Sequence, residues 1–392
     1  MEATFRPDVA RALRAHVLDH ADTLETGALA AAVEGAGPAR APADAGLIVD
    51  TERDSHLLGP TSTKLDVKVQ LRMAHVPTSV CHLFDAASHP LLTCSAARAL
   101  GAENRTRRLR VTAGVEGYSA PAIATVELDS PKPQTFDLLP TFYPERLAGL
   151  TELTRATVTV LVDDLDSGLV ELHRTSAIWL LARTTAVLSV MDPATGANQD
   201  LTRYFGAFVT PNHPRVLAFL QNVKQHHPAK VLAGYQGAPE GVTAQVQAAY
   251  DAVHEDVDVT YVNTTIAFAP DDTTTPMQRV RLPAEALETG AANCIDGVVL
   301  LASLIEAMSL NPAIVVIPGH AFLGWETWEG SGEWRYLETT MLGTQPFDVA
   351  AARGEAEAAA MQKLAHDRKD ESLFRRWSLR QLRRELGIVP MV

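Results

Sequence analysis

The stretch ETGAANCIDGVVLLASLIEAMSL, residues 288–310, decides how the second half of this chain is read. Its apolar residues recur at helical spacing from Cys294 onward and predict a buried helix. Cys294 itself stands in the first turn of that helix. A cysteine there can be a small apolar filler of the core, or a nucleophile whose thiolate is favoured by the helix N-terminus. The segments that follow decide between these two roles.

The helix predicted from Cys294 to Met308 is followed by a strand that returns the chain to its starting level. The helix covers roughly 21 Å at about 1.5 Å per residue. After the turn SLNP, the strand AIVVIPG covers roughly 23 Å at about 3.3 Å per residue. The matching lengths place His320 beside Cys294. A second turn, EGSG, predicts a hairpin that brings Glu338 within a few residues of the level of His320.

A thiol, an imidazole and a carboxylate so arranged are the parts of a thiol acyl-transfer site. Cys294 supplies the thiolate in this interpretation, and His320 moves the proton between the thiol and the leaving amine. Glu338 fixes the tautomer and orientation of His320. Backbone N–H groups at the start of the helix are candidates to bind the oxyanion.

The pieces ANCIDGVVLLASLIEAMSLNP, VIPGHAFLGW and WRYLETT, with QRVRLPAEAL before them, resemble the transglutaminase-like superfamily of papain-fold cysteine enzymes, in particular its bacterial members. The resemblance covers roughly residues 250–343 and implies that Cys294, His320 and Glu338 form a catalytic triad. Ala292 stands where the family often has glycine, and Glu338 is one methylene longer than the usual aspartate. We expect no metal or other cofactor.

Five further residues near the predicted site carry a second interpretation. We expect Asp296 to cap the helix or pair with its dipole rather than act as an acid catalyst. Asn293 adjoins the thiol and either shapes the site or forms a turn. The amide of Gln278 is a candidate to reach the oxyanion. Trp325 and Trp334 flank the hairpin and either pack in the core or line a substrate groove.

Composition limits the class of protein. The chain has 392 residues, 46% of them hydrophobic and 21% charged, with a net charge of −13. This is typical of a globular protein with ample core, and the negative charge argues against nucleic acid as a partner. No apolar run approaches the roughly 18 residues that span a bilayer. Three cysteines are too few for a disulfide framework, and no histidines have metal-ligand spacing. We therefore expect a cytoplasmic protein without a membrane partner.

The fold class expected is α+β, with a mostly antiparallel β-sandwich domain followed by a transglutaminase-like, papain-like α+β domain. Short alternating strands with turn residues between them predict the sandwich. The domains are an N-terminal helix (about residues 7–33) and linker over 1–45, the sandwich over 46–200, the catalytic domain over 201–365, and a basic helix over 366–392. We expect that last helix to dock on the acidic body, or to contact a second subunit or a partner protein.

Three functions remain open from the sequence. The first is thiol-dependent hydrolysis of a peptide or other amide bond, with a protein or peptide as substrate. The second uses the same acyl-enzyme but passes the acyl group to an amine, as in cross-linking, or to water, as in deamidation. The third is a scaffold of the same fold that binds a peptide without turnover. The presence of all three triad residues favours an enzyme over a scaffold.

Overall fold

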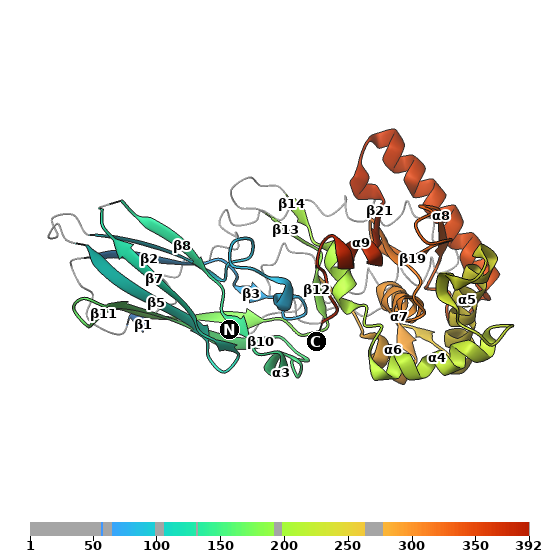
Figure 1. The fold of residues 1–392 in the computed structure, drawn as a ribbon, viewed down its shortest axis with the longest axis horizontal. Helices are drawn as coiled ribbons and strands as arrows, with labels where there is room; N and C mark the ends of the chain where they lie inside the picture. The colour runs from blue at the N-terminus through green and yellow to red at the C-terminus, as the bar shows by residue number, and fades with distance from the viewer. Residues whose placement is uncertain are drawn as a thin grey trace, which may run out of the picture. The chain divides into compact units, whose positions relative to one another are not determined.

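The computed structural model describes residues 56–57, 65–98, 106–130, 132–191, 198–262 and 277–391 (Figure 1). Within them the chain is a mixed α+β protein with several antiparallel sheets, as the sequence predicted at this level. The predicted N-terminal helix and linker lie outside the described residues. None of the helices that the structure describes is both long enough and apolar enough to cross a membrane.

Two sheets built from residues 56–180 share one hydrophobic core. Their strands and the short elements between them are β1 (His56–Leu57), β2 (Leu65–Leu71), β3 (His75–Val76), η1 (Cys81–Leu83), β4 (Leu92–Arg98), β5 (Arg107–Val115), β6 (Ser119–Ala120), β7 (Ala122–Leu128), β8 (Gln134–Leu138), β9 (Thr141–Phe142), α3 (Pro144–Leu147), β10 (Thr154–Asp164) and β11 (Leu169–Leu180). One sheet has the order β2–β4–β8, and the other β1–β11–β10–β5–β7 with β3 beside β11. Buried Leu109 and Val111 alternate with exposed Arg108 and Arg110, which is the period of a sheet with one buried face.

A mainly helical region follows. It contains β12 (Thr185–Val187), β13 (Ser189–Met191), β14 (Asn198–Asp200), η2 (Thr202–Phe208), α4 (Pro214–His226), η3 (Gly234–Gln236), α5 (Pro239–Ala252), the π-helical turn η4 (Val253–Val257), β15 (Thr260–Tyr261), β16 (Met277–Arg279) and α6 (Pro283–Thr289). Helices α4, α5 and α6 each begin at a proline, whose fixed φ and missing N–H suit the first helical position. Strand β12 pairs with β16, and β13 pairs with β14.

After α6 the chain forms β17 (Ala291–Ala292) and α7 (Cys294–Ala307). It is followed by β18 (Pro312–Ile317), β19 (His320–Glu326), β20 (Trp334–Leu337), α8 (Phe347–Arg368), η5 (Glu371–Leu373), β21 (Arg375–Ser378) and α9 (Leu379–Arg384). Four of these strands form an antiparallel sheet of order β20–β19–β18–β21. The helix, returning strand and hairpin predicted from the sequence are therefore confirmed.

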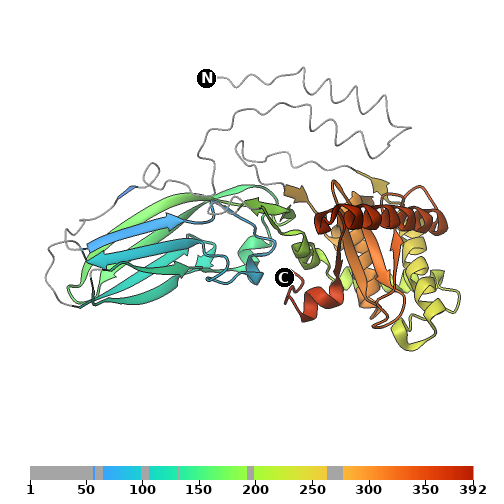
Figure 2. The same cartoon turned by 90° about the horizontal axis from the view of Figure 1, so that it is seen from above.

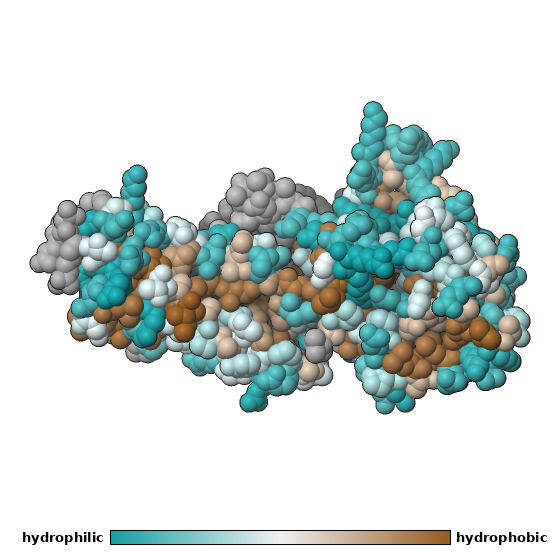
Figure 3. Space-filling model, in the orientation of Figure 1, coloured by the Kyte–Doolittle hydropathy of each residue, from teal (hydrophilic) through white to brown (hydrophobic). Residues whose placement is uncertain are grey.

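The two faces of this sheet belong to different hydrophobic clusters. Ile314, Leu323 and Leu337 face the large cluster that contains α7. Their neighbours along the strands, Phe322 and Tyr336 among them, face a smaller cluster. Helix α8 lies across the strands (Figure 2) and contributes to both clusters, first through Phe347 and Ala350 and then through Ala358. Its outer side is hydrophilic (Figure 3). Helix α8 thus closes the β20 edge of the sheet and covers its second face.

The basic helix predicted over residues 366–392 is wrong. Residues 375–378 form β21, which pairs antiparallel with β18, and only Leu379–Arg384 is helical after it. Pairing with the edge of β18 outweighs the helical pattern of the segment, because without β21 the side of β18 that faces away from β19 would leave N–H and C=O groups without backbone partners. Arg380 and Arg383 pair with Glu326 and Glu306 of the same chain. The segment docks within its own chain as an edge strand and a short helix.

Candidate active site

Cys294 is the first residue of α7, and a capping box determines that the helix begins there. Asn293 is the N-cap; its side chain accepts from the backbone N–H of Asp296 at 2.9 Å. In return, the Asp296 carboxylate accepts from the N–H of Asn293 at 3.0 Å. This reciprocal pair satisfies two N–H groups that a helix start leaves without intrahelical acceptors. The predicted capping role of Asp296 is confirmed, and its side chain is fully buried.

Arg281 anchors the same carboxylate from the segment before α6. The backbone N–H of Arg281 donates to Asp296 at 2.6 Å, and its guanidinium donates at 3.1 Å. The guanidinium also donates to the carbonyl of Ala291 at 2.9 Å. Burial raises the pKa of Asp296, although the donors from Asn293 and Arg281 oppose that rise. The turn before Cys294 is therefore held both by the capping box of α7 and by Arg281.

His320 is placed by the tight turn between β18 and β19. The two strands pair up to Ile317 and His320, so only Pro318 and Gly319 connect them. Gly319 has a φ of +74°, a left-handed conformation that suits glycine and two-residue hairpin turns. His320 is the first residue of β19, and its side chain is 23% exposed. The hairpin therefore presents the imidazole at the end of the sheet rather than in its middle.

Glu338 follows the last residue of β20 and is held on all sides. Its Oε2 lies 2.7 Å from Nε2 of His320, and its Oε1 accepts from the N–H and hydroxyl of Thr340 at 2.8 and 2.7 Å. Its own N–H donates to the carbonyl of Ala350 in α8 at 3.0 Å. Burial alone would raise the pKa of Glu338, but the hydrogen bond and charge of His320 outweigh it, so the pKa is lowered. Glu338 is therefore a buried, ionised partner of the imidazole.

Cys294 is coupled to His320 from the other side of the ring. Burial disfavours the charged imidazole, but hydrogen bonds with Cys294 and Glu338 outweigh it and raise the pKa of His320 to about 10. Because Nε2 is engaged by Glu338, Nδ1 is the ring atom left for the sulfur. The hydroxyl of Thr339 donates to the carbonyl of Cys294 at 2.9 Å, which ties the start of α7 to the end of β20. The structure thus brings together the three residues that the sequence predicted as a unit.

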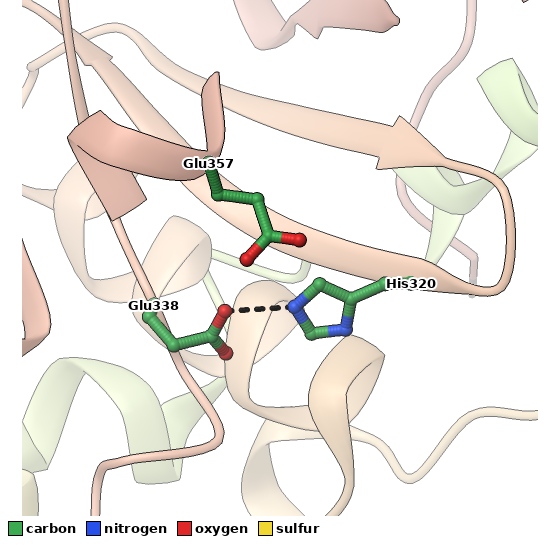
Figure 4. Close-up of side chains that lie close together, drawn as sticks. All are labelled: His320, Glu338 and Glu357. Atoms are coloured by element: carbon green, nitrogen blue, oxygen red, sulfur yellow. Dashed lines mark hydrogen bonds and ion pairs between the residues drawn. The ribbon is translucent and has the colours of Figure 1, made fainter. Parts of the chain in front are cut away.

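A fourth side chain, Glu357 of α8, also reaches this group, on the side of His320 and Glu338 (Figure 4). A ring nitrogen of His320 and one carboxylate oxygen each from Glu338 and Glu357 all lie within 4.8 Å of one another. An imidazole and two carboxylates are ligand types found around divalent metals. However, the 2.7 Å between Nε2 and Oε2 is shorter than the roughly 3.4 Å between two ligands about 2.1 Å from one tetrahedral ion. The arrangement fits a shared proton better than a metal ion.

The remaining predicted residues lie at varying distances from the triad. The Gln278 amide donates to the carbonyl of Arg279 at 2.9 Å, and Asn293 donates to the same carbonyl at 3.4 Å. Gln278 is therefore close to the start of α7, with its amide turned to the backbone. Trp325 is fully buried and packs against Phe347, so it is a core residue and not a wall of a groove. Trp334 begins β20, four positions before Glu338, and its ring stacks on Arg376.

Sequence reasoning missed two residues of this site. Glu357 shares one face of α8 with Ala350 and Gly354, and only that helical spacing could have indicated it. Tyr261 in β15 pairs with Ala292, two residues before the thiol, and is 49% exposed. Burial and then the negative charges of Cys294 and Glu338 raise the pKa of Tyr261. No local signal in the sequence indicates this pairing.

No family model, curated protein or solved structure matches this chain. The basis for assigning a function is therefore the arrangement of its side chains, above all the hydrogen bond between buried Glu338 and partly exposed His320 beside Cys294.

Proposed function

We propose that this chain is a thiol-dependent hydrolase of peptide or other amide bonds, with Cys294 as nucleophile. The observation that carries the proposal is the 2.7 Å hydrogen bond between His320 and the buried Glu338, with Cys294 near enough to the same ring to raise its pKa. Three separate elements (the start of α7, the start of β19 and the end of β20) supply these residues. A thiol, a base and a residue that orients the base form the minimal set for covalent acyl transfer.

The proposed reaction has two halves. The Cys294 thiolate attacks the amide carbonyl, the C–N bond breaks, and protonated His320 gives its proton to the leaving nitrogen. Neutral His320 then takes a proton from water, whose oxygen attacks the thioester and releases the acid and the thiolate. Glu338 stabilises the imidazolium at each stage where it forms. The N–H of Cys294, at a helix position without an intrahelical acceptor, is a candidate oxyanion donor.

The other two cysteines serve as internal controls for this proposal. Burial raises the pKa of Cys81 to about 11 and that of Cys94 to about 12, so both are neutral thiols at pH 7. A thiolate held beside an imidazolium is alkylated at neutral pH, whereas a neutral thiol reacts slowly. We expect iodoacetamide at pH 6.5–7 to alkylate Cys294 at least about tenfold faster than Cys81 or Cys94, with the adducts located by mass spectrometry.

His320→Ala provides the matched variant for this test. Without the imidazole, alkylation of Cys294 at pH 6.5–7 should slow by about tenfold or more. If Cys294 in the unmodified chain reacts no faster than Cys81 or Cys94, and His320→Ala leaves its rate unchanged, the two residues are not a catalytic pair. The proposal would then give way to a binding scaffold. Cys294→Ala, which removes a single sulfur atom, should abolish turnover of any substrate found while leaving the chain folded.

A further inference from the structure

We propose that Glu357 is a second carboxylate partner of His320, a positioning residue that acts through the ring to favour its imidazolium form. Its consequence for catalysis rests on the function proposed above, but the interaction itself does not. Glu357 lies on a helix outside the stretch of chain that carries the triad. Nevertheless, its carboxylate is directed at the bond between Glu338 and His320 (Figure 4).

The packing of α8 explains why the carboxylate is there. Ala350, Gly354 and Glu357 follow one another at helical spacing and so lie on one face of α8. Ala350 accepts from the N–H of Glu338, and a Cβ on Gly354 would lie 2.6 Å from the nitrogen of Leu337. The backbone of α8 is thus in direct contact with the end of β20. Because helical side chains tilt toward the helix N-terminus, Glu357 points back toward Glu338.

Both carboxylate oxygens of Glu338 already take part in hydrogen bonds, including the one to His320. Glu357 therefore does not replace that hydrogen bond; it contributes a second negative charge near the ring. Oε2 of Glu338 faces His320, and Oε1 accepts twice from Thr340. The side chains of Glu338 and Glu357 are only 4% and 9% exposed. An opposite charge within about 4–6 Å typically favours the charged form of a group by about 1–3 pKa units. Water screens little of this interaction, since Glu338 is buried and Glu357 is largely covered.

A cation on the same helix competes with His320 for Glu357. Nη2 of Arg353 lies 3.3 Å from Oε2 of Glu357, but the Arg353 side chain is 50% exposed. The Arg353 charge is therefore partly screened, and it weakens the effect of Glu357 without cancelling it. The other titratable groups that face the ring are Cys294 from α7 and Glu338. Tyr261 from β15 pairs with Ala292 along the backbone, and the charges of Cys294 and Glu338 contribute to its raised pKa.

Two substitutions on α8 should consequently shift the titration of His320 in opposite directions. Glu357→Gln removes the second negative charge and should lower the pKa of His320 by about one unit or more. Arg353→Gln removes the competing cation and should raise the pKa by a few tenths of a unit, because the arginine is half exposed. Glu355→Gln is the matched control: it removes the same charge from the same helix, but Glu355 pairs with Arg335.

The measurement is the histidine Cε1–H titration by NMR on the full chain in a Cys294→Ser background. That background removes the thiolate, so Glu338 and Glu357 remain as the ring's charged partners. Among the 13 histidines, His320 is assigned from the signal lost in His320→Gln. A downward shift in Glu357→Gln with little change in Glu355→Gln supports the inference. Equal shifts in the two variants overturn it.

If the Glu357→Gln variant does not fold, Arg353→Gln takes its place, because the half-exposed Arg353 side chain is not part of the core. An upward shift in Arg353→Gln supports the inference, and no shift or a downward one contradicts it. Alkylation of Cys294 in the unmodified chain tests the proposed hydrolase separately. If Cys294 has ordinary reactivity while the pKa of His320 still falls in Glu357→Gln, the proposed function fails and this inference stands. If Cys294 is unusually reactive but the pKa of His320 does not change in Glu357→Gln, the proposed function stands and this inference fails.

Discussion

Replacing Asp296 with alanine should destabilise the body that carries Cys294 more than any other single carboxylate change near α7. Asp296 is fully buried and accepts from the N–H of Arg281 at 2.6 Å, the N–H of Asn293 at 3.0 Å and the Arg281 guanidinium at 3.1 Å. Asp296→Ala leaves those donors without this acceptor and removes the capping box. Breaking a buried ion pair in this way typically costs about 3–5 kcal/mol.

The lower end of that range is expected, about 3 kcal/mol. The Arg281 guanidinium keeps its hydrogen bond to the carbonyl of Ala291 and lies 3.5 Å from Glu285, so it is not left wholly unpaired. Burial raises the pKa of Asp296, which means that burying the ionised carboxylate is unfavourable. At neutral pH the charge of Asp296 by itself therefore lowers the stability of the fold. The predicted loss therefore comes from the partners left behind and not from the carboxylate's own solvation.

The assay is urea unfolding followed by tryptophan fluorescence. Of the 5 tryptophans, four lie between residues 325 and 377, in or beside the sheet packed on α7. Asp348→Ala is the matched control, since Asp348 is also in the first turn of a helix, α8, but is exposed. It should cost at most about 0.5–1 kcal/mol. A loss below about 1 kcal/mol for Asp296→Ala, equal to that of the control, would refute the claim that this network holds the start of α7.

Two further predictions concern the contact between α8 and β20 and the charge of its buried carboxylate. Gly354→Ala should destabilise the chain by about 1–3 kcal/mol in urea unfolding, because the added Cβ would lie 2.6 Å from the nitrogen of Leu337. Gly241→Ala in α5 meets nothing within 4 Å and should instead stabilise by about 0.5–1 kcal/mol; effects of the same sign would contradict the packing described. The lowered pKa of Glu338 means that its stabilising contribution is complete above its ordinary value of 4.5 and is lost as the pH falls through the folded value. The unfolding free energy of the unmodified chain should therefore fall more steeply below pH 4.5 than that of Glu338→Gln. Parallel plots of unfolding free energy against pH for the two proteins would show that the charge of Glu338 is not coupled to folding.

Several features of this protein follow from short stretches of sequence. The start of α7 is specified by Asn293 and Asp296, three residues apart, followed by a long apolar run. Helix and strand lengths, together with the two-residue turn between β18 and β19 and the longer loop between β19 and β20, bring His320 and then Glu338 back to that start. The alternation of apolar and polar residues predicts the antiparallel strands of the N-terminal sheets. These predictions succeed because caps, turns and periodicity depend on residues that are neighbours along the chain.

Other features were decided only when distant segments met. Residues 375–378 carry a helical pattern, yet they form β21 because the edge of β18, more than fifty residues earlier, offers a partner. Trp325 is a core residue because α8 brings Phe347 against it. Glu357 reaches His320 only because Gly354 lets α8 touch β20. Sheet pairing, burial and Coulomb interactions depend on distances in space, and the sequence order of the partners does not contain those distances.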